Sequence, residues 1–404
     1  MDRFAVFGSP ISHSKSPDIY NTLFQENNIT AYYTRVLARD IQEISIMNSI
    51  LKLDGFNLTS PLKGTFPNRG SINTVYNSDR GNSYYNTDNE HFIELINSLK
   101  INNSTVLIIG GGESAKNIIS ILRDKQILYD IILRNPEHKK TQLYYIQSLL
   151  NITDINKVIN NYEIIINTIP HTKSYLEDGL KIENKLIIDL IYQIDVFGDK
   201  LLNCKYISGE MWLIAQAIKS FEYYYPKARS KEVNSIKSKK YNSIALLGFM
   251  GAGKTTLAKA IAKRLSFNYI DIDEQIVMRY GDISNIFQQK GEDQFRKMEQ
   301  SVLEEIDFTN CNIIATGAGI LSSSGQINIL KKNTYRIWVV SYLENSFKRI
   351  QNTDRPLLKD YAKYIELYEN RVDTYFSNSD LVVLNENFNE TVDLLAKEIQ
   401  NYVI

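Results

Sequence analysis

The stretch IALLGFMGAGKTT, residues 244–256, places an apolar run directly before a glycine-rich loop and a lysine. It fits the pattern G-x-x-x-x-G-K-[ST], in which backbone N–H groups surround phosphate oxygens at the start of a helix. Lys254 is expected to reach the terminal phosphates, and Thr255 is expected to bind magnesium. The residues assigned to nucleotide binding are Gly248, Gly251, Gly253, Lys254, Thr255 and Thr256. The stretch therefore predicts a strand, a phosphate-binding loop and a helix that hold a nucleoside triphosphate.

A second glycine-rich turn, VLIIGGGESAKNI at residues 106–118, comes well before the first. Gly110, Gly111 and Gly112 follow an apolar run, which is typical of a dinucleotide-binding turn. A single nucleotide site needs only one such loop. The length of 404 residues exceeds what one hydrophobic core usually supports, so we expect two or three domains, which leaves room for two nucleotide sites.

The composition indicates an ordinary globular protein with no overall charge. Apolar residues make up 43% of the chain and charged residues 23%, and 46 Lys and Arg balance 46 Asp and Glu. This balance gives no overall field to attract nucleic acid or a membrane surface. Cys204 and Cys311 suggest neither a disulfide nor a zinc site. With no signal-peptide pattern and no run of about 20 apolar residues, we expect a cytoplasmic location.

Short apolar runs alternate with amphipathic stretches along the chain, which predicts an α/β fold. One series occupies residues 1–98, a second 99–209 and a third 242–404. A helix over 210–225 is expected to pack back on the first series. Residues 226–241 are basic and poor in large apolar side chains, so they are the expected linker.

Two local patterns make specific structural predictions. KKTQLYYIQSLL at residues 139–150 predicts a helix, and NYIDID at 268–273 predicts a strand. Alternate residues of a strand share a face, so Asp271 and Asp273 are expected to lie side by side. One of the two would serve the magnesium ion while the other meets a substrate hydroxyl.

Several motifs follow the phosphate-binding loop in order: DID at 271–273, FRKME at 295–299, TGAG at 316–319, DRPLL at 354–358 and ENRVDTY at 369–375. This order resembles the shikimate kinase family, P-loop enzymes of the nucleoside monophosphate kinase fold, over residues 243 to about 400. The resemblance implies that Asp273 approaches the shikimate hydroxyls. It also implies that Arg296 and Arg371 hold the carboxylate and that Arg355, from a lid, meets the phosphates of ATP.

The glycine turn of this pattern is altered. The resemblance makes residues 317–319 a substrate-binding turn, in which the family has three glycines and this chain has Gly317, Ala318 and Gly319. The added Cβ of Ala318 would be unfavourable if its φ were positive. After Arg371 the family's proline is absent, whereas the tyrosine, Tyr375, is retained.

The N-terminal segments AVFGSPISHSKSPDIYN, GFNLTSPLKGTF, SINTVYN and YYNTDNEHF resemble the shikimate dehydrogenase family, from Phe4 to Tyr225. The resemblance implies substrate hydrogen-bonding groups at Ser14, Ser16, Thr59, Asn73, Tyr192 and Gln216. It makes Lys63 and Asp88 the catalytic pair. A lysine beside a carboxylate suits ketone reduction, because it can supply or relay a proton and steady the developing alkoxide.

The same resemblance assigns the dinucleotide cofactor to an N-terminal Rossmann-type domain. The implied cofactor-binding residues are Gly110, Gly111, Gly112, Arg134, Lys139 and Gly209. Glu113 and Ser114 replace the family's second glycine pair. After the next strand the family usually has Asn-Arg-Thr, and Arg134 lies one position before the place of that arginine. The strand DIILRN, residues 130–135, is followed by basic groups, with no acid before Glu137. This pattern favours NADP(H) over NAD(H).

Together the two resemblances predict a bifunctional enzyme. It would reduce 3-dehydroshikimate to shikimate with NADPH and then phosphorylate shikimate with ATP and Mg²⁺, toward the aromatic amino acids. An alternative is an active kinase fused to a non-catalytic or quinate-preferring module, since Glu113 is unfavourable near a pyrophosphate. The oligomeric state stays open.

Overall fold

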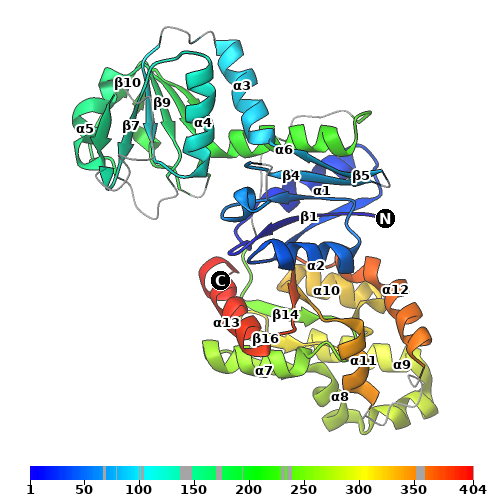
Figure 1. The fold of residues 1–404 in the computed structure, drawn as a ribbon. Coiled ribbons are helices and arrows are strands. Elements are labelled where there is room, and N and C mark those ends of the chain that lie inside the picture. Colours follow the sequence, from blue (N-terminus) through cyan, green and yellow to red (C-terminus); the bar gives the residue numbers. More distant parts are fainter. Residues whose placement is uncertain are drawn as a thin grey trace. The chain divides into compact units, whose positions relative to one another are not determined.

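The computed structural model of the chain describes residues 1–66, 70–78, 80–99, 101, 104–136, 148–169, 175–192, 194–228, 233, 239–351 and 360–403. The chain forms two compact units (Figure 1). The first contains Met1–Leu62, Asn77–Gly81 and Lys237–Ile404, and the second contains Lys63–Tyr76 and Asn82–Ile236. The α/β class predicted from the sequence is confirmed.

The first unit contains a sheet built from both ends of the chain. Its strands are β1 (Asp2–Gly8), β2 (Ala31–Leu37), β3 (Gly55–Leu58), β14 (Ser243–Leu247), β15 (Asn268–Asp271), β16 (Asn312–Ala315), β17 (Thr334–Val340) and β18 (Leu381–Leu384). They run in the order β15-β16-β14-β17-β18-β2-β1-β3, and neighbouring strands are parallel. The junction pairs Leu381 with Arg35 and Val382 with Val36.

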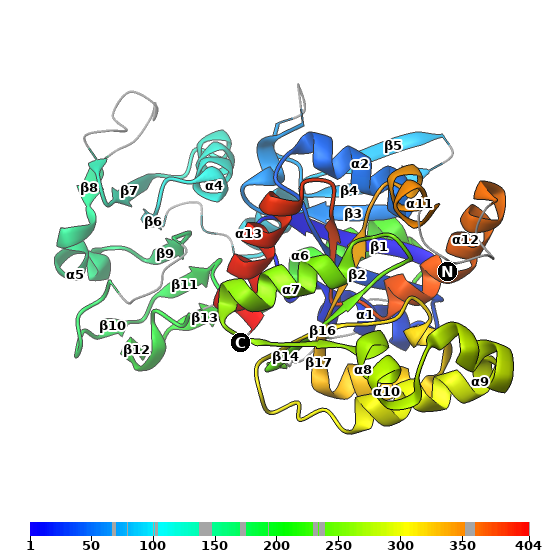
Figure 2. The same ribbon diagram turned by 90° about the horizontal axis from the view of Figure 1, so that it is seen from below.

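Helices cover this sheet because its central strands are buried along their whole length. Every residue of β14 and β17 is buried, as in parallel sheets covered on both faces. The helices are α1 (Ser16–Glu26), α2 (Ile41–Leu51), α7 (Lys254–Leu265), α8 (Ile272–Tyr280), α9 (Ile283–Glu304), α10 (Ser324–Asn333), α11 (Leu343–Gln351), α12 (Tyr361–Ser377) and α13 (Phe388–Glu398), with a 3₁₀ turn at Ile320–Ser322 and a π-helix at Ile399–Val403. Helices α7 and α13 lie side by side (Figure 2).

The second unit contains a six-stranded sheet in the order β13-β11-β9-β6-β7-β8. Its strands are β6 (Val106–Ile109), β7 (Tyr129–Leu133), β8 (Leu149–Asn151), β9 (Ile164–Asn167), β11 (Leu186–Asp189) and β13 (Lys205–Ile207), all paired in parallel. Counted along the chain, this is the order 3-2-1-4-5-6 of a dinucleotide-binding sheet. Such a sheet binds its ligand where the order reverses, here beyond β6 and β9.

Two hydrophobic clusters lie on opposite faces of this sheet. Val106 and Ile108 of β6 pack with α4 (Glu113–Asp124), whereas Leu107 and Ile109 pack with α5 (Ile155–Val158). This alternation is what a strand with period two requires. Figure 1 shows α4 and α5 on the two sides of the sheet.

Strands β4 (Thr74–Ser78) and β5 (Gly81–Tyr85) continue the first sheet beyond β3, and β10 (Ile182–Glu183) pairs in parallel with β12 (Leu201–Leu202) in a separate two-stranded sheet. The other described elements are helices α3 (Thr87–Leu99) and α6 (Gly209–Tyr224), and 3₁₀ turns at Leu62–Gly64, Ile152–Asp154, Ile159–Asn161 and Gly198–Lys200. Helix α6 packs against α3, with the rings of Phe92 and Trp212 at 6.1 Å. None of the helices described is long and apolar enough to cross a membrane.

Two local predictions need correction. Residues 139–147 of the expected helix lie outside the described residues, but Leu149 and Leu150 belong to strand β8, which pairs with β7. The expected strand over 268–273 ends at Asp271, because its carboxylate accepts a hydrogen bond from the Glu274 N–H at 3.1 Å and caps α8. Asp273 therefore lies in the first helical turn. Of the expected linker, only residues 226–228, 233 and 239–241 are described.

Candidate functional sites

The phosphate-binding loop, residues 248–253, joins β14 to α7 as the sequence predicts. Gly251 and Gly253 have φ values of 79° and 89°, which strain any other residue. A Cβ at Gly251 would also overlap the carbonyl of Ser346. Lys254 Nζ donates to the carbonyl oxygens of Gly248 at 2.8 Å and Phe249 at 3.1 Å. The lysine is thus held over the loop, at the N-terminus of α7.

A hydroxyl and a carboxylate meet beside this loop. Thr255 Oγ1 donates to Asp271 Oδ2 at 3.0 Å, and Asp271 is buried. Oxygen ligands of this kind suit a magnesium ion that is also bound by phosphates. Thr256, the next residue of α7, is exposed.

The glycine turn, residues 317–319, follows β16 and lies against three polar side chains. A Cβ at Gly317 would lie 2.8 Å from Glu299 Oε1 and 3.1 Å from Asp273 Oδ1, and one at Gly319 would overlap the Arg296 guanidinium. A side chain at either position would therefore displace the polar groups that lie against the turn. Ala318 does not have a positive φ, so its Cβ causes no backbone strain.

Helix α12 connects the glycine turn to the phosphate-binding loop. Arg371 Nη1 donates to the Ala318 carbonyl at 3.1 Å. The Tyr375 phenol lies 2.5 Å from the same carbonyl and 3.1 Å from that of Gly248. Burial raises the pKa of Tyr375, which keeps the phenol a donor. Arg371 and Tyr375 thus position the turn even without the proline.

Lys63 and Asp88 form a hydrogen-bonded ion pair in the second unit. Lys63 lies in the 3₁₀ turn Leu62–Gly64, and Asp88 lies in the first turn of α3. Their side chains are 19% and 20% exposed, so the pair is sheltered but open to a ligand.

Asn73 and Gln216 lie close to this pair. Ile72 N donates to the Lys63 carbonyl at 2.8 Å, which places Asn73 next to the lysine segment. Asn73 Nδ2 donates to Gln216 Oε1 at 3.2 Å. The structure therefore brings together Lys63, Asn73, Asp88 and Gln216, which the sequence predicts as one site.

Ser14, Ser16 and Thr59 lie in the first unit, beyond the carboxyl ends of β1 and β3. Ser14 Oγ donates to Ser16 Oγ at 3.3 Å, and both residues are buried. Thr59 N donates to the Phe7 carbonyl at 3.1 Å, and a Cβ at Gly8 would lie 2.6 Å from Thr59 Cγ2. Three hydroxyl groups are therefore held at adjacent strand ends.

The dinucleotide-type turn follows β6 in the second unit. Gly110 has a φ of 115°, and a Cβ there would overlap the Thr168 hydroxyl after β9. Gly112 is the N-cap of α4, and a Cβ there would meet nothing within 4 Å. With Gly111 between them, the turn leaves open space at a helix N-terminus, which suits a phosphate group.

Charged residues predicted to lie near this turn are only partly described by the structure. Glu113 pairs with Lys116 at 2.6 Å along α4, with both side chains about half exposed. Arg134 is exposed directly after β7. Lys139 lies outside the described residues.

Comparison with known proteins gives two separate matches along the chain. A profile of the shikimate kinase family matches residues 250–403, and one of the shikimate dehydrogenase substrate binding domain matches residues 6–68. The shikimate kinase of Macrococcus caseolyticus is 35% identical over 164 residues, which cover 39% of this chain and 95% of the relative. The NADP(+) shikimate dehydrogenase of Helicobacter hepaticus is 30% identical over 260 residues, which cover 56% of this chain and 92% of the relative.

The chain belongs to the shikimate dehydrogenase and shikimate kinase families. The dehydrogenase part is N-terminal and the kinase part is C-terminal. The crystal structure of shikimate dehydrogenase from Aquifex aeolicus aligns with a TM-score of 0.47 and 21% identity, over 57% of this chain and 94% of that one.

In the shikimate kinase part, sequence reasoning missed the acids that hold Arg296. The guanidinium pairs with Glu299 at 2.5 Å and Glu292 at 2.8 Å on α9. Glu299 is fully buried, and burial raises its pKa while Arg296 opposes the shift. The i−4 and i+3 spacing to Arg296 is the signal that could have found them. Arg355 lies outside the described residues.

In the shikimate dehydrogenase part, a hydroxyl cluster that sequence reasoning missed orients Asn73. Thr87 N donates to Asn73 Oδ1 at 2.9 Å, and Asn73 Nδ2 donates to Thr87 Oγ1 at 2.9 Å. Ser220 Oγ lies 3.1 Å from Thr87 Oγ1. Ser220 follows Gln216 by one helical turn, a spacing that places both on one face of α6.

Sequence reasoning also missed Asp189, whose side chain holds the segment that carries Tyr192. Its carboxylate accepts hydrogen bonds at 2.9 Å from Asn167 Nδ2 and Ile191 N. Burial raises the pKa of Asp189 to about 6. A Cβ at Gly209 would lie 2.6 Å from Tyr192 N, so glycine lets α6 begin against this segment.

Proposed function

We propose that the two enzymes catalyse consecutive steps, so that shikimate made by the dehydrogenase part is phosphorylated by the kinase part. The dehydrogenase would reduce 3-dehydroshikimate with NADPH, and the kinase would transfer a phosphoryl group from ATP to the 3-hydroxyl of shikimate. One observation carries the proposal: Lys63 pairs with Asp88 near Asn73 and Gln216 in one unit, and Lys254 lies over the phosphate-binding loop beside Thr255 and Asp271 in the other.

For the kinase, phosphoryl transfer mainly requires positioning and charge neutralisation. ATP supplies the phosphoryl group and Mg²⁺ neutralises charge on the phosphates when they are bound. Lys254 would meet the terminal phosphates, and Thr255 with Asp271 would hold the metal. Asp273 would orient the substrate hydroxyl, close to the glycine turn.

The substrate carboxylate would be held by arginines at the same turn. Arg296 and Arg371 both approach residues 317–319, and guanidinium groups bind carboxylates with two parallel hydrogen bonds. Because Glu292 and Glu299 fix Arg296 in advance, little side-chain entropy would be lost on binding. We propose that Arg355 completes the phosphate site.

For the dehydrogenase, NADPH supplies the hydride and the protein supplies the proton. Lys63, paired with Asp88, would donate a proton to the developing alkoxide and would then be reprotonated from water, with the Asp88 carboxylate relaying the proton. The hydroxyl and amide groups proposed to bind the substrate are those of Ser14, Ser16, Thr59, Asn73, Tyr192 and Gln216. The intact ion pair favours a catalytic module over a purely binding one.

The cofactor would bind at the turn after β6. The open space at Gly112 and the helix N-terminus suit the pyrophosphate. Glu113 is engaged with Lys116 on the helix surface, so its charge does not exclude the cofactor.

Incubating the purified protein with 3-dehydroshikimate, NADPH, ATP and Mg²⁺ tests the proposal. We expect shikimate 3-phosphate, with one NADPH oxidised and one ATP consumed for each molecule formed. If ATP is consumed on added shikimate but NADPH is never oxidised with 3-dehydroshikimate, the N-terminal part is a non-catalytic module instead.

The glycine turn gives a first mutational prediction. Gly319→Ala should raise the KM for shikimate about tenfold or more, because the new Cβ overlaps Arg296 and a charged hydrogen bond of about 1.5–3 kcal/mol is lost. Steady-state kinetics at saturating ATP measure it. Ala318→Gly is the matched control and should leave KM unchanged. If Gly319→Ala and Ala318→Gly have the same KM for shikimate, Arg296 does not bind the substrate carboxylate.

The cofactor preference gives a second prediction. We expect a higher kcat/KM with NADPH than with NADH, because an exposed arginine follows β7 where NAD enzymes place an acid. Arg134→Ala should reduce this preference by about tenfold, the effect of losing one charge-assisted hydrogen bond to the 2′-phosphate. Better use of NADH by the wild type would contradict the preference, and an unchanged ratio in the variant would exclude Arg134.

A further inference from the structure

A carboxylate of the kinase part is buried against the dehydrogenase part. Glu398 is the last residue of α13 and is only 3% exposed. Its Oε1 accepts a hydrogen bond from Ile11 N, and its Oε2 accepts one from Ser12 N, both at 2.9 Å. A buried carboxylate requires such partners, and each oxygen here has its own donor.

The loop bound in this way is the one that carries the substrate serines. Residues 9–15 join β1 to α1, and Ser14 follows Ser12 by two residues. Glu398 therefore fixes the backbone just before the proposed substrate-binding hydroxyls of Ser14 and Ser16.

A second connection reaches the same loop through Arg35 of β2. Arg35 Nε donates to the Ser14 carbonyl at 2.8 Å, and Arg35 Nη1 donates to the Asp380 carbonyl at 3.3 Å. Asp380 directly precedes β18 of the kinase part, which pairs with β2. The loop is thus held from both α13 and β18.

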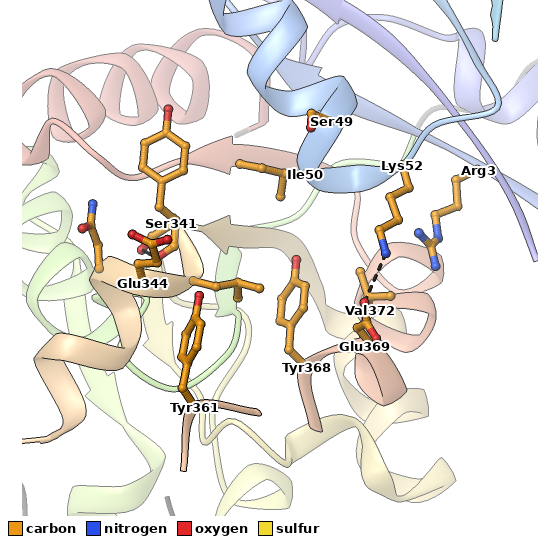
Figure 3. A pocket seen from close by; sticks show the side chains of 13 residues that line it. Arg3, Ser49, Ile50, Lys52, Ser341, Glu344, Tyr361, Tyr368, Glu369 and Val372 are labelled. Atoms are coloured by element: carbon orange, nitrogen blue, oxygen red, sulfur yellow. Dashed lines mark hydrogen bonds and ion pairs between the residues drawn. The ribbon is translucent and has the colours of Figure 1, made fainter. Parts of the chain in front are cut away.

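These contacts belong to a continuous interface within the first unit. Thr34 Oγ1 donates to the Ser379 carbonyl at 3.0 Å, and Arg3 Nε donates to Asp373 Oδ1 at 2.7 Å. Farther along, a cavity of about 600 Å³ separates α2 from α12, and the Lys52–Glu369 pair crosses its rim at 3.1 Å (Figure 3). That pair is exposed and contributes little, whereas the Glu398 contacts are buried.

We propose that Glu398 of the kinase part is a positioning residue for the dehydrogenase reaction, because it holds the loop that presents Ser14 and Ser16 to the substrate. This inference rests on the proposed dehydrogenase activity. The kinase part would then be a structural component of the dehydrogenase substrate site, although Glu398 itself touches no reacting atom.

Glu398→Gln in the full chain tests the proposal. Glutamine keeps the shape, but its NH₂ group faces one of the two N–H donors, so one hydrogen bond is lost. We expect the KM of the dehydrogenase for its ketone substrate to rise about tenfold, the effect of losing one hydrogen bond to a charged group, with kcat for reduction near the wild-type value. The KM for NADPH and both kinase constants should not change.

The matched control is Asp393→Asn on the same helix. Asp393 is 58% exposed and pairs with Arg264 at 3.4 Å, away from the loop. Asp393→Asn should leave the KM of the dehydrogenase for its ketone substrate unchanged. If Glu398→Gln lowers kinase activity in parallel, or leaves the dehydrogenase KM at the wild-type value, the positioning role is wrong.

Hydrogen exchange supplies a readout that does not depend on activity. Amides in peptides covering residues 9–16 should exchange faster in Glu398→Gln than in Asp393→Asn, and equal rates would overturn the proposal. If the wild type fails to reduce 3-dehydroshikimate, the proposed function is wrong, while exchange still tests the contact. Should Glu398→Gln not fold, Glu398→Asp retracts the carboxylate by one methylene and is expected to raise the same KM.

Discussion

Replacing Lys254 with alanine is expected to lower the rate of shikimate phosphorylation at saturating substrate by at least about a hundredfold, the usual cost of removing one preorganised charge-stabilising donor. The lysine is the first residue of α7 and is held over the phosphate-binding loop, where its charge would meet the terminal phosphates. Coupled assays of ADP release with shikimate measure the loss.

The dehydrogenase reaction provides the internal control for Lys254→Ala. NADPH oxidation by the same preparation should stay near the wild-type rate, since Lys254 has no part in that site. Lys259→Ala is the matched variant, because Lys259 lies on the same helix, is 53% exposed and pairs with Glu274 at 2.9 Å. It should retain full kinase activity. A kinase that tolerates the loss of Lys254 would contradict its assigned role.

Short contiguous patterns were the most predictable features. The segment 248–256 specifies its own conformation, because glycines at positive φ and a helix N-terminus are properties of neighbouring residues. The same holds for residues 110–112 after β6. Both nucleotide turns could therefore be located from the sequence before any tertiary contact was known.

Features that depend on distant partners could not be predicted in this way. The pairing of β18 with β2 joins Leu381 to Arg35, and no local pattern encodes a partner so far along the chain. The contact of Glu398 with Ile11 could not be predicted for the same reason. Chain order predicted separate series of elements, whereas the structure joins the first strands to the kinase sheet.

The prediction that placed Asp273 in a strand was wrong, although its position beside the glycine turn agrees with the role proposed for it. Period-two spacing predicted that it would share a strand face with Asp271. The structure instead ends β15 at Asp271, whose side chain caps α8. Asp273 still lies next to Gly317, because the first turn of α8 faces the glycine turn.

The reverse experiment removes the lysine of the dehydrogenase pair. Lys63→Ala is expected to lower the rate of ketone reduction at saturating substrate by about 10²–10⁴-fold, the range typical of a positioned acid or base, because the alkoxide would lose its proton donor. Shikimate phosphorylation should continue at the wild-type rate. Stopped assays that separate shikimate from shikimate 3-phosphate measure both steps in one sample.

The Lys63→Ala result distinguishes catalysis from a structural salt bridge. Asp88 is already 20% exposed beside Lys63, and truncating the lysine opens the carboxylate further to water, so the fold should survive. The control is Lys157→Ala, whose side chain is 78% exposed and pairs with Asp154 at 3.2 Å, and it should reduce 3-dehydroshikimate normally. If the folded Lys63→Ala protein still reduces its substrate, a group other than Lys63 donates the proton. Loss of both activities in that folded protein would contradict two separate sites on one chain.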